Sequence, residues 1–312
     1  MPKLIKRVIP YLLLAVILTL FSFSGCGSYT PSTMPWTGTA PETLTQQQWQ
    51  DIFKVALEYQ EHLEAFHLNE MTSINTEVVG GSNPWERSLN ISLVGAKNLV
   101  DEQTKMNLNI SMIMEGMGQT SEDQTVIYDM YAPSDWLYIS MATLNMGSYW
   151  IRVKRSGELE EFFSFNAAEQ QMKTLNSTTN IEYLRTEKLN DVDCYVLSIT
   201  PNNNELASWL EKQDTGFQGI DWQKVTNDTS ALKDLNFTCY LAKDSYLIMS
   251  MSMNMVIELT PEQANATSAD FDTTQISFNI NLALSNQNES FTITLPMDAY
   301  TAKEVSSDIF LD

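Results

Sequence analysis

The feature that most constrains this chain is a regular alternation of side-chain character along residues 244–259. Between positions 247 and 257 every second residue is apolar, and the residues between them are mostly Ser or Asn. A period of two is typical of a β-strand, because successive Cβ atoms leave opposite faces of a sheet. The stretch is therefore predicted to be a strand with one apolar face, formed by Leu247, Met249, Met251, Met253, Met255 and Ile257.

The same alternation recurs in two other stretches, residues 106–114 and 276–284. Further strands are expected at 149–153 and 291–295, and hairpins at 126–141 and 181–200. Because the predicted connections are short and the strands have one apolar face, an antiparallel sheet is the simplest arrangement. The apolar positions of the two stretches are Met106, Leu108, Ile110, Met112 and Met114, and Ile276, Phe278, Ile280, Leu282 and Leu284.

A helix is predicted ahead of the strands. Thr45 and Gln48 have the spacing of a capping box, and apolar residues then recur at helical spacing to about residue 66. The apolar stripe of this helix needs a partner, and the apolar side of the sheet supplies one. Two short helices are also expected, at 166–175 and 205–212. Residues 44–312 are therefore predicted to form a single α+β domain.

The first 26 residues have the composition of an export signal. Lys3, Lys6 and Arg7 precede an apolar run that ends in Ser24-Gly25-Cys26, and this ending resembles the lipobox of bacterial lipoproteins. Lipidation of Cys26 would anchor the chain through its acyl groups. The alternatives are an ordinary secretory leader with an incidental cysteine, or an uncleaved anchor. Residues 27–43, with Ser, Thr, Pro and Gly and no periodicity, are predicted to be a flexible tether on the order of 20 to 25 Å long.

The charge of the chain argues against one class of partner. The formal net charge is -21, and Lys and Arg form no cluster that could neutralise phosphate groups. Binding to nucleic acid is therefore not expected.

No arrangement of residues typical of an enzyme or a metal site is present. The two histidines, His62 and His67, are five residues apart, which does not match the spacing of four used by helical zinc sites. There is no G-x-S-x-G motif, and there is no phosphate-binding loop. Acidic pairs at 191/193 and 270/272 are more typical of turns than of calcium sites. We therefore expect no catalytic residues, no metal and no cofactor.

Cys194 and Cys239 are candidates for a disulfide, which export would permit. The alternation of side chains along the two strands argues against this disulfide. Cys239 shares a face with Phe237 and Leu241, whereas Cys194 lies opposite Tyr195, Leu197 and Ile199, so a bridge between neighbouring strands would need a bulge.

The chain resembles the LolA/LppX-like lipoprotein superfamily, in particular its Met-rich bacterial members of unassigned function. The resemblance covers about residues 44–300, and it rests on the lipobox at Cys26, the helix ahead of the sheet and the strands at 107–114, 149–153, 193–201 and 246–257. It implies a curved antiparallel β-sheet, a half-open barrel, with the N-terminal helix and shorter helices covering its concave apolar face. It also implies an apolar cavity that can take lipid. Its own anchor distinguishes this chain from the carrier LolA and favours residence at one membrane.

Methionine side chains are flexible and polarizable, and they suit surfaces that accept variable apolar shapes. The expected function is that of a monomeric lipoprotein, anchored at the outer face of the cell membrane, that binds a lipid or acyl chain between sheet and helices. The alternative is an envelope sensor or protein-interaction lipoprotein whose core is fully packed. The candidate ligand face consists of Leu108, Ile110, Met112, Met114, Leu247, Met249, Met251, Met253 and Met255.

Overall fold

The computed structural model describes residues 43–60, 62–80, 84–116, 119–133, 135–143, 147–155, 180–212, 221–228, 230–263 and 272–306. The predicted leader with Cys26, the tether up to residue 42 and the predicted helix at 166–175 lie outside these ranges. Within them, no helix is both long enough and apolar enough to cross a membrane.

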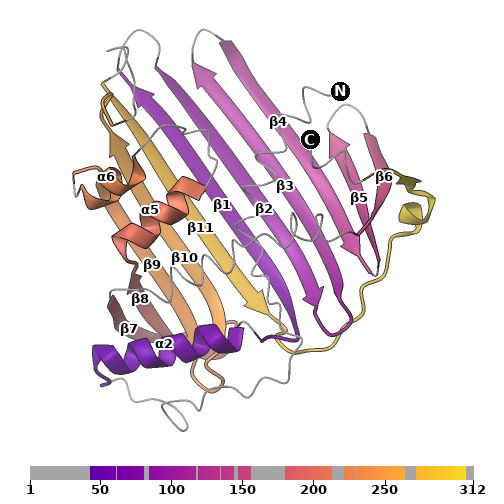
Figure 1. Ribbon diagram of the computed structural model, residues 1–312, viewed down its shortest axis with the longest axis horizontal. Helices are drawn as coiled ribbons and strands as arrows, with labels where there is room; N and C mark the ends of the chain where they lie inside the picture. The colour runs from indigo at the N-terminus through magenta and orange to yellow at the C-terminus, as the bar shows by residue number, and fades with distance from the viewer. Residues whose placement is uncertain are drawn as a thin grey trace.

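The predicted antiparallel sheet is confirmed, and it is the main body of the molecule (Figure 1). Its spatial order is β12-β6-β5-β4-β3-β2-β1-β11-β10-β9-β8-β7, so it stays open, with β12 and β7 at its edges. The strands are β1 (Ala65–Val79), β2 (Trp85–Asn98), β3 (Gln103–Gly116), β4 (Gln119–Ala132), β5 (Trp136–Thr143), β6 (Gly147–Lys154), β7 (Asn180–Leu189), β8 (Val192–Thr200), β9 (Leu232–Ala242), β10 (Ile248–Leu259), β11 (Thr273–Ser285) and β12 (Lys303–Glu304).

Two meanders make up this sheet. Strands β1 to β6 follow one another in space as they do in sequence, and so do β7 to β11. The two meanders join through the pairing of β1 with β11, which extends from His67 to Val79 of β1. Neighbouring strands are antiparallel except that β12 runs parallel to β6. The first and last long strands of the domain therefore lie side by side at the centre of the sheet.

The predicted hairpins are present. Strand β4 pairs with β5 from Val126 onward, and β7 pairs with β8 around the turn at Asn190 and Asp191. Both turn residues have positive φ, 49° and 66°. Asn and Asp tolerate this conformation better than other side-chain-bearing residues, and it matches the twist of a two-residue hairpin.

Helix α2 (Gln46–Gln60) begins where the capping box predicts. The Thr45 backbone N–H donates to Oε1 of Gln48 (2.9 Å), and the Gln48 N–H donates to Oγ1 of Thr45 (3.4 Å). The helix ends earlier than predicted, because β1 begins at Ala65 to pair with the end of β2. Phe66 is therefore a strand residue, although it is buried as expected.

The remaining helices are α5 (Asn203–Lys212), which was predicted, and α6 (Trp222–Asn227), which was not. In Figure 1, α2, α5 and α6 lie with the β7 to β10 half of the sheet. Contacts join α2 to β7 and β10, and join α5 to α6.

The predicted strand at 291–295 is wrong. These residues form no strand, and the chain continues into a short 3-10 helix, η1 (Met297–Thr301), beside β6. Side chains of β2 and β3 form hydrogen bonds to the backbone of this segment, where a neighbouring strand would otherwise do so. Nδ2 of Asn98 donates to the Phe291 carbonyl (2.7 Å), and the Ile293 N–H donates to Oε1 of Gln103 (2.8 Å). The apolar residues of this segment reflect packing at the end of the sheet.

Candidate functional site

The candidate site is the apolar face of the sheet, which we define as the face that carries Leu108 of β3 and Met251 of β10. Directly opposed residues share a face, so the register connects these two strands through β2, β1 and β11. One such row across five strands is Leu108, Leu93, Glu70, Leu282 and Met251. At about 4.8 Å between strands, the row spans roughly 19 Å. The two Met-rich stretches therefore belong to one surface.

The predicted residues of this face differ in depth. In β3, Leu108 and Ile110 are buried, Met112 is half-buried, and Met114 at the end of the strand is 38% exposed. In β10, Met251, Met253 and Met255 are buried.

A β-bulge interrupts the predicted alternation at the start of β10. The register shifts between Ile248 and Ser250, so that Ile248 is opposite Leu241 and is completely buried. Leu247 lies just before the strand and packs partly against the core, and Met249 is half-buried. The regular alternation of the apolar face thus begins at Met251. Before the bulge, Ile248 points into the core, and the predicted core positions Leu247 and Met249 are only half-buried.

Helix α2 packs on the β7 to β10 end of the sheet through Trp49. The Trp49 ring stacks on Tyr183 of β7 with centroids 5.4 Å apart, and meets Tyr195 of β8 edge-on at 5.0 Å. Ile52, Phe53 and Leu57, at helical spacing from Trp49, are also buried. This part of the apolar surface is filled by the protein's own side chains.

Two glutamines bind the backbone of Ile248 at the bulge of β10, and one of them, Gln60, is the last residue of α2. The Ile248 N–H donates to Oε1 of Gln60 (3.3 Å), and Nε2 of Gln287 donates to the Ile248 carbonyl (2.7 Å). Both backbone groups of Ile248 are thereby satisfied at the bulge. The side chains that do this come from α2 and from the turn after β11.

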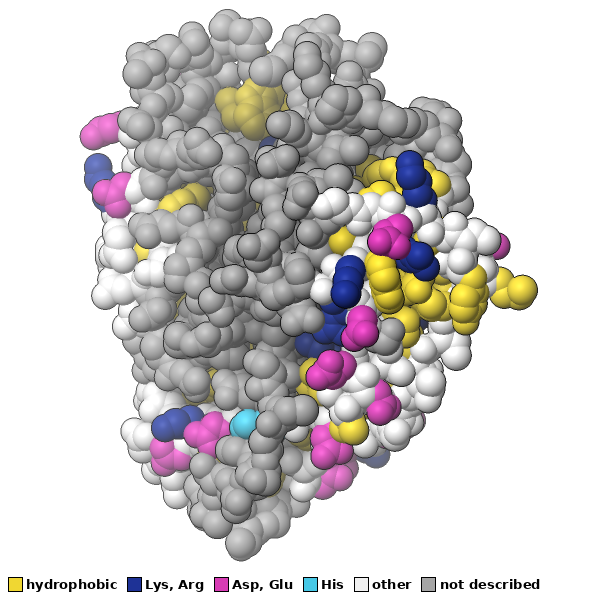
Figure 2. Space-filling model, turned by 45° about the vertical axis from the view of Figure 1, so that its right-hand side comes forward, with side chains coloured by type: hydrophobic (Ala, Val, Ile, Leu, Met, Phe, Trp, Pro, Cys, Tyr) yellow, Lys and Arg dark blue, Asp and Glu magenta, His cyan; other side chains and the backbone are white. Residues whose placement is uncertain are grey.

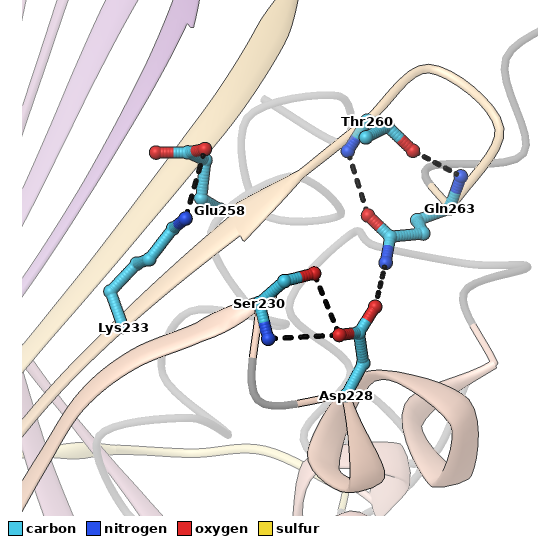
Figure 3. Close-up of polar contacts among 6 residues, drawn as sticks. All are labelled: Asp228, Ser230, Lys233, Glu258, Thr260 and Gln263. Carbon is cyan, nitrogen blue, oxygen red and sulfur yellow. Dashed lines mark hydrogen bonds and ion pairs between the residues drawn. The ribbon is translucent and has the colours of Figure 1, made fainter.

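A polar network joins the α6–β9 connection to the end of β10 (Figure 3). Asp228 accepts hydrogen bonds from the Ser230 N–H (2.8 Å), from Ser230 Oγ (2.7 Å) and from Nε2 of Gln263 (3.0 Å). These bonds favour the carboxylate, and they lower the pKa of Asp228 below its ordinary value. Lys233 and Glu258 form an ion pair beside the network, at 3.4 Å. The network links the end of α6 to the turn that follows β10.

Glu70 is the residue of this face that the sequence analysis missed. It is 1% exposed, and burial raises its pKa to about 8, so that its carboxyl group is mostly protonated at neutral pH. A signal for it exists in the sequence: Leu68, Glu70, Thr72 and Ile74 occupy alternate positions of one strand. An acidic residue in phase with apolar positions indicates a carboxyl group facing the core.

At one end of the same face lies Lys97 of β2, opposite Phe66 and Thr104. Burial and the nearby guanidinium of Arg155 lower its pKa to about 8. Within the described ranges, no three His, Cys, Asp or Glu side chains gather into a metal site.

The two candidate disulfide partners are free thiols in the structure, and both are buried. Cys239 is opposite Leu197 on the apolar face, whereas Cys194 is opposite Ala242 on the other face. The two sulfurs therefore lie on opposite sides of the sheet, as the parity of the strands indicates. Burial raises the pKa of both thiols, which keeps them protonated.

Exposed apolar side chains lie near β6, on the side of the molecule that Figure 2 brings forward, where hydrophobic side chains are seen beside acidic and basic ones. Met297 and Tyr300 of η1 are 87% and 70% exposed, and Tyr149 of β6 is also exposed.

Comparison with solved structures finds matches at low sequence identity and with TM-scores below 0.5. LprF from Mycobacterium bovis is 11% identical, with a TM-score of 0.40, and the match covers 83% of this chain and 99% of that chain. Lipoprotein LppX from Mycobacterium tuberculosis is 10% identical, with a TM-score of 0.38 and coverage of 80% and 100%. A DUF1329 family protein from Desulfovibrio piger is 12% identical, with a TM-score of 0.22 and coverage of 81% and 95%.

No curated protein matches the chain. A family model does match it, from residue 48 in α2 to residue 304 in β12, and so includes every described strand and helix except the first residues of α2. The chain therefore belongs to the family of unknown function DUF6612.

Proposed function

We propose that this protein is an extracytoplasmic lipoprotein that binds a lipid or acyl chain on the apolar face of its sheet. In this proposal Cys26 carries the membrane anchor, the monomeric domain stays at the outer face of the cell membrane, and the helices cover the concave side of the sheet. No catalytic step is involved. The ligand is a hydrophobic molecule that the protein holds without changing it.

The observation that supports the proposal best is the extent of the apolar face. It continues from Met251 in β10 across β11, β1 and β2 to Leu108 in β3, and then to Tyr128 in β4. The packing of α2 is centred on β7 and β10, at one end of this span. Methionines occur at both ends of the face, and their flexible side chains can adapt to an acyl chain.

The binding test uses a variant that fills the face. Met112→Trp adds a large ring at a half-buried position of β3, and Ile113→Trp adds the same ring on the opposite face of the same strand. We expect Met112→Trp to displace a bound fluorescent fatty acid and Ile113→Trp to leave binding unchanged. Equal binding by both variants and the parent protein would place the ligand elsewhere, and no binding by any of the three would contradict the proposed function.

The anchor is tested separately. Cys26→Ala should move the protein from the membrane fraction to the soluble extracytoplasmic fraction, because the acyl groups that hold it are then missing. Continued membrane retention of Cys26→Ala would indicate an uncleaved apolar leader.

A protein-interaction role is the second candidate, and the exposure of Met297 and Tyr300 favours it. Under this alternative the apolar face is fully packed core. Native mass spectrometry after gentle extraction distinguishes the two roles. Co-purified lipid supports ligand binding, and a protein whose mass includes no ligand supports the packed core.

A further inference from the structure

Glu70 lies at the centre of the apolar face. Its strand, β1, is flanked by β11 and β2, and the residues directly opposite Glu70 are Leu282 and Leu93. Both are buried leucines, and Leu68 precedes Glu70 on the same face of β1. The carboxyl group is therefore surrounded in the sheet by apolar side chains.

Among the described residues, only one oxygen of this carboxyl group has a hydrogen-bond partner. Oγ1 of Thr72 donates to Oε1 of Glu70 at 3.0 Å, and Oε2 is buried and has no partner in the described part of the chain. Because burial keeps the group protonated at neutral pH, one of its oxygens carries a proton that it can donate.

Charged side chains on the adjacent strands are too far away to pair with Glu70. On the same face of β2 they are Arg87 and Lys97, six and four residues from Leu93, which corresponds to about 20 and 13 Å along a strand. The same face of β1 and of β11 carries no other ionisable residue in the described strands.

A buried polar atom without a partner is costly and is rare in folded proteins. A leucine or methionine at position 70 would fill the same space without this cost. The unsatisfied oxygen at the centre of a proposed ligand face indicates that its partner arrives with the ligand.

We propose that Glu70 donates a hydrogen bond to a carbonyl oxygen of an acyl ligand bound on the apolar face. The inference rests on the proposed function and makes it more specific: the ligand is a fatty acid ester or similar acyl lipid, and not a plain hydrocarbon. Thr72 orients the carboxyl group by donating to its other oxygen.

The test compares two probes of similar size, methyl laurate, which has a carbonyl group, and pentadecane, which has none. Each displaces the fluorescent probe N-phenyl-1-naphthylamine from the full-length protein at pH 6. Glu70→Met removes the donor, and Glu70→Gln keeps one. We expect Glu70→Met to lower the affinity for methyl laurate about ten-fold, which corresponds to the loss of a hydrogen bond of ~1.4 kcal/mol. Its affinity for pentadecane should not change. Glu70→Gln should bind methyl laurate nearly as well as the parent protein.

The pH supplies a second measurement that does not depend on the Met variant. At pH 9.5 Glu70 ionises and loses its proton, so the parent protein should lose its preference for methyl laurate, whereas Glu70→Gln should keep it. If the parent protein binds neither probe, the proposed function is wrong. If it binds both, and neither Glu70→Met nor high pH changes the relative affinity for methyl laurate, the role of Glu70 is wrong and the proposed function stands.

Discussion

Strands β10 and β1 alternate in the same way, but their buried faces differ in chemistry. Every buried residue of β10 is apolar, from Ile248 and Met251 to Leu259. On β1 the buried face includes Glu70, Thr72 and Thr76 among apolar residues. The β10 face has the composition of a closed protein core, with α2 packed at its end. The β1 face keeps polar groups where a purely structural core would be apolar. Under the proposed function, the ligand would therefore lie against the middle strands of the sheet, whereas α2 packs at the β7 to β10 end.

The largest expected effect is that of an acidic residue in the β10 core. Met251→Asp buries an unpaired carboxylate and removes apolar contacts, so it should lower the free energy of unfolding by about 5 kcal/mol or more. Ser252→Asp, on the other face of the strand, is the control and should cost little. Met112→Asp, at a half-buried position of β3, should cost less than Met251→Asp. Urea denaturation measures all three, and equal costs at 251 and 112 would show that the apolar face is packed as closely at β3 as at β10.

Glu70→Gln tests the β1 region through pH. The pKa of Glu70 is raised from 4.5 to about 8 in the folded protein, so the native state prefers the protonated form. Protonated Glu70 therefore does not destabilise the folded protein below pH 4.5, and the free energy of unfolding falls as the pH rises from 4.5 toward 8. We therefore expect Glu70→Gln to match the parent protein at pH 4 and to exceed it by roughly 4 kcal/mol at pH 8.

Unfolding free energies of Glu70→Gln and the parent protein, measured in urea at several pH values, check this expectation. A constant difference across the pH range would mean that Glu70 has the same pKa in the folded and unfolded protein, so that its burial does not raise the pKa.

Gln60→Ala tests how firmly α2 is held to β10. Without Gln60 the buried N–H of Ile248 loses its acceptor, which should cost about 1 to 3 kcal/mol. Gln47→Ala, at an exposed position of the same helix, should be nearly neutral. Thermal denaturation compares the two variants, and a neutral Gln60→Ala would show that the aromatic contacts of Trp49 are sufficient to hold the helix.

The smallest effect is expected at Asp228. Hydrogen bonds from Ser230 lower its pKa in the folded protein, so its contribution to stability is present at neutral pH and is lost as the pH falls through the lowered value. Asp228→Asn should therefore slightly increase amide hydrogen exchange in the α6–β9 connection at pH 7 and have no effect at strongly acidic pH. Equal exchange in both proteins at pH 7 would show that the network in Figure 3 does not stabilise this connection.

Much of the fold could be predicted because local patterns were strong. The alternation in β3, β10 and β11 and the turn at Asn190 depend on residues close together in the chain, and so does the capping box of Thr45 and Gln48. The end of α2 could not be predicted, because it depends on where β1 pairs with β2. The segment at 291–295 misled the prediction, since its apolar residues pack at a sheet end while Asn98 and Gln103 bind its backbone.

The candidate site was predicted in part. The sequence identified the apolar positions of β3 and β10, but it could not place them in one row five strands wide, because that depends on β1 pairing with β11, for example Glu70 with Leu282, across a long separation in sequence. The bulge at Ile248 changes which residues face inward, and it is visible only in the register with β9.

The sequence alone determined which side chains share a face within each strand, because the two-residue period is a property of the extended backbone itself. It also determined where the first helix and the hairpin at Asn190 begin. The tertiary structure decided which strands are neighbours and what each buried group meets. The unpartnered oxygen of Glu70 is such a feature, because its surroundings come from leucines on strands that are distant in sequence, Leu93 and Leu282.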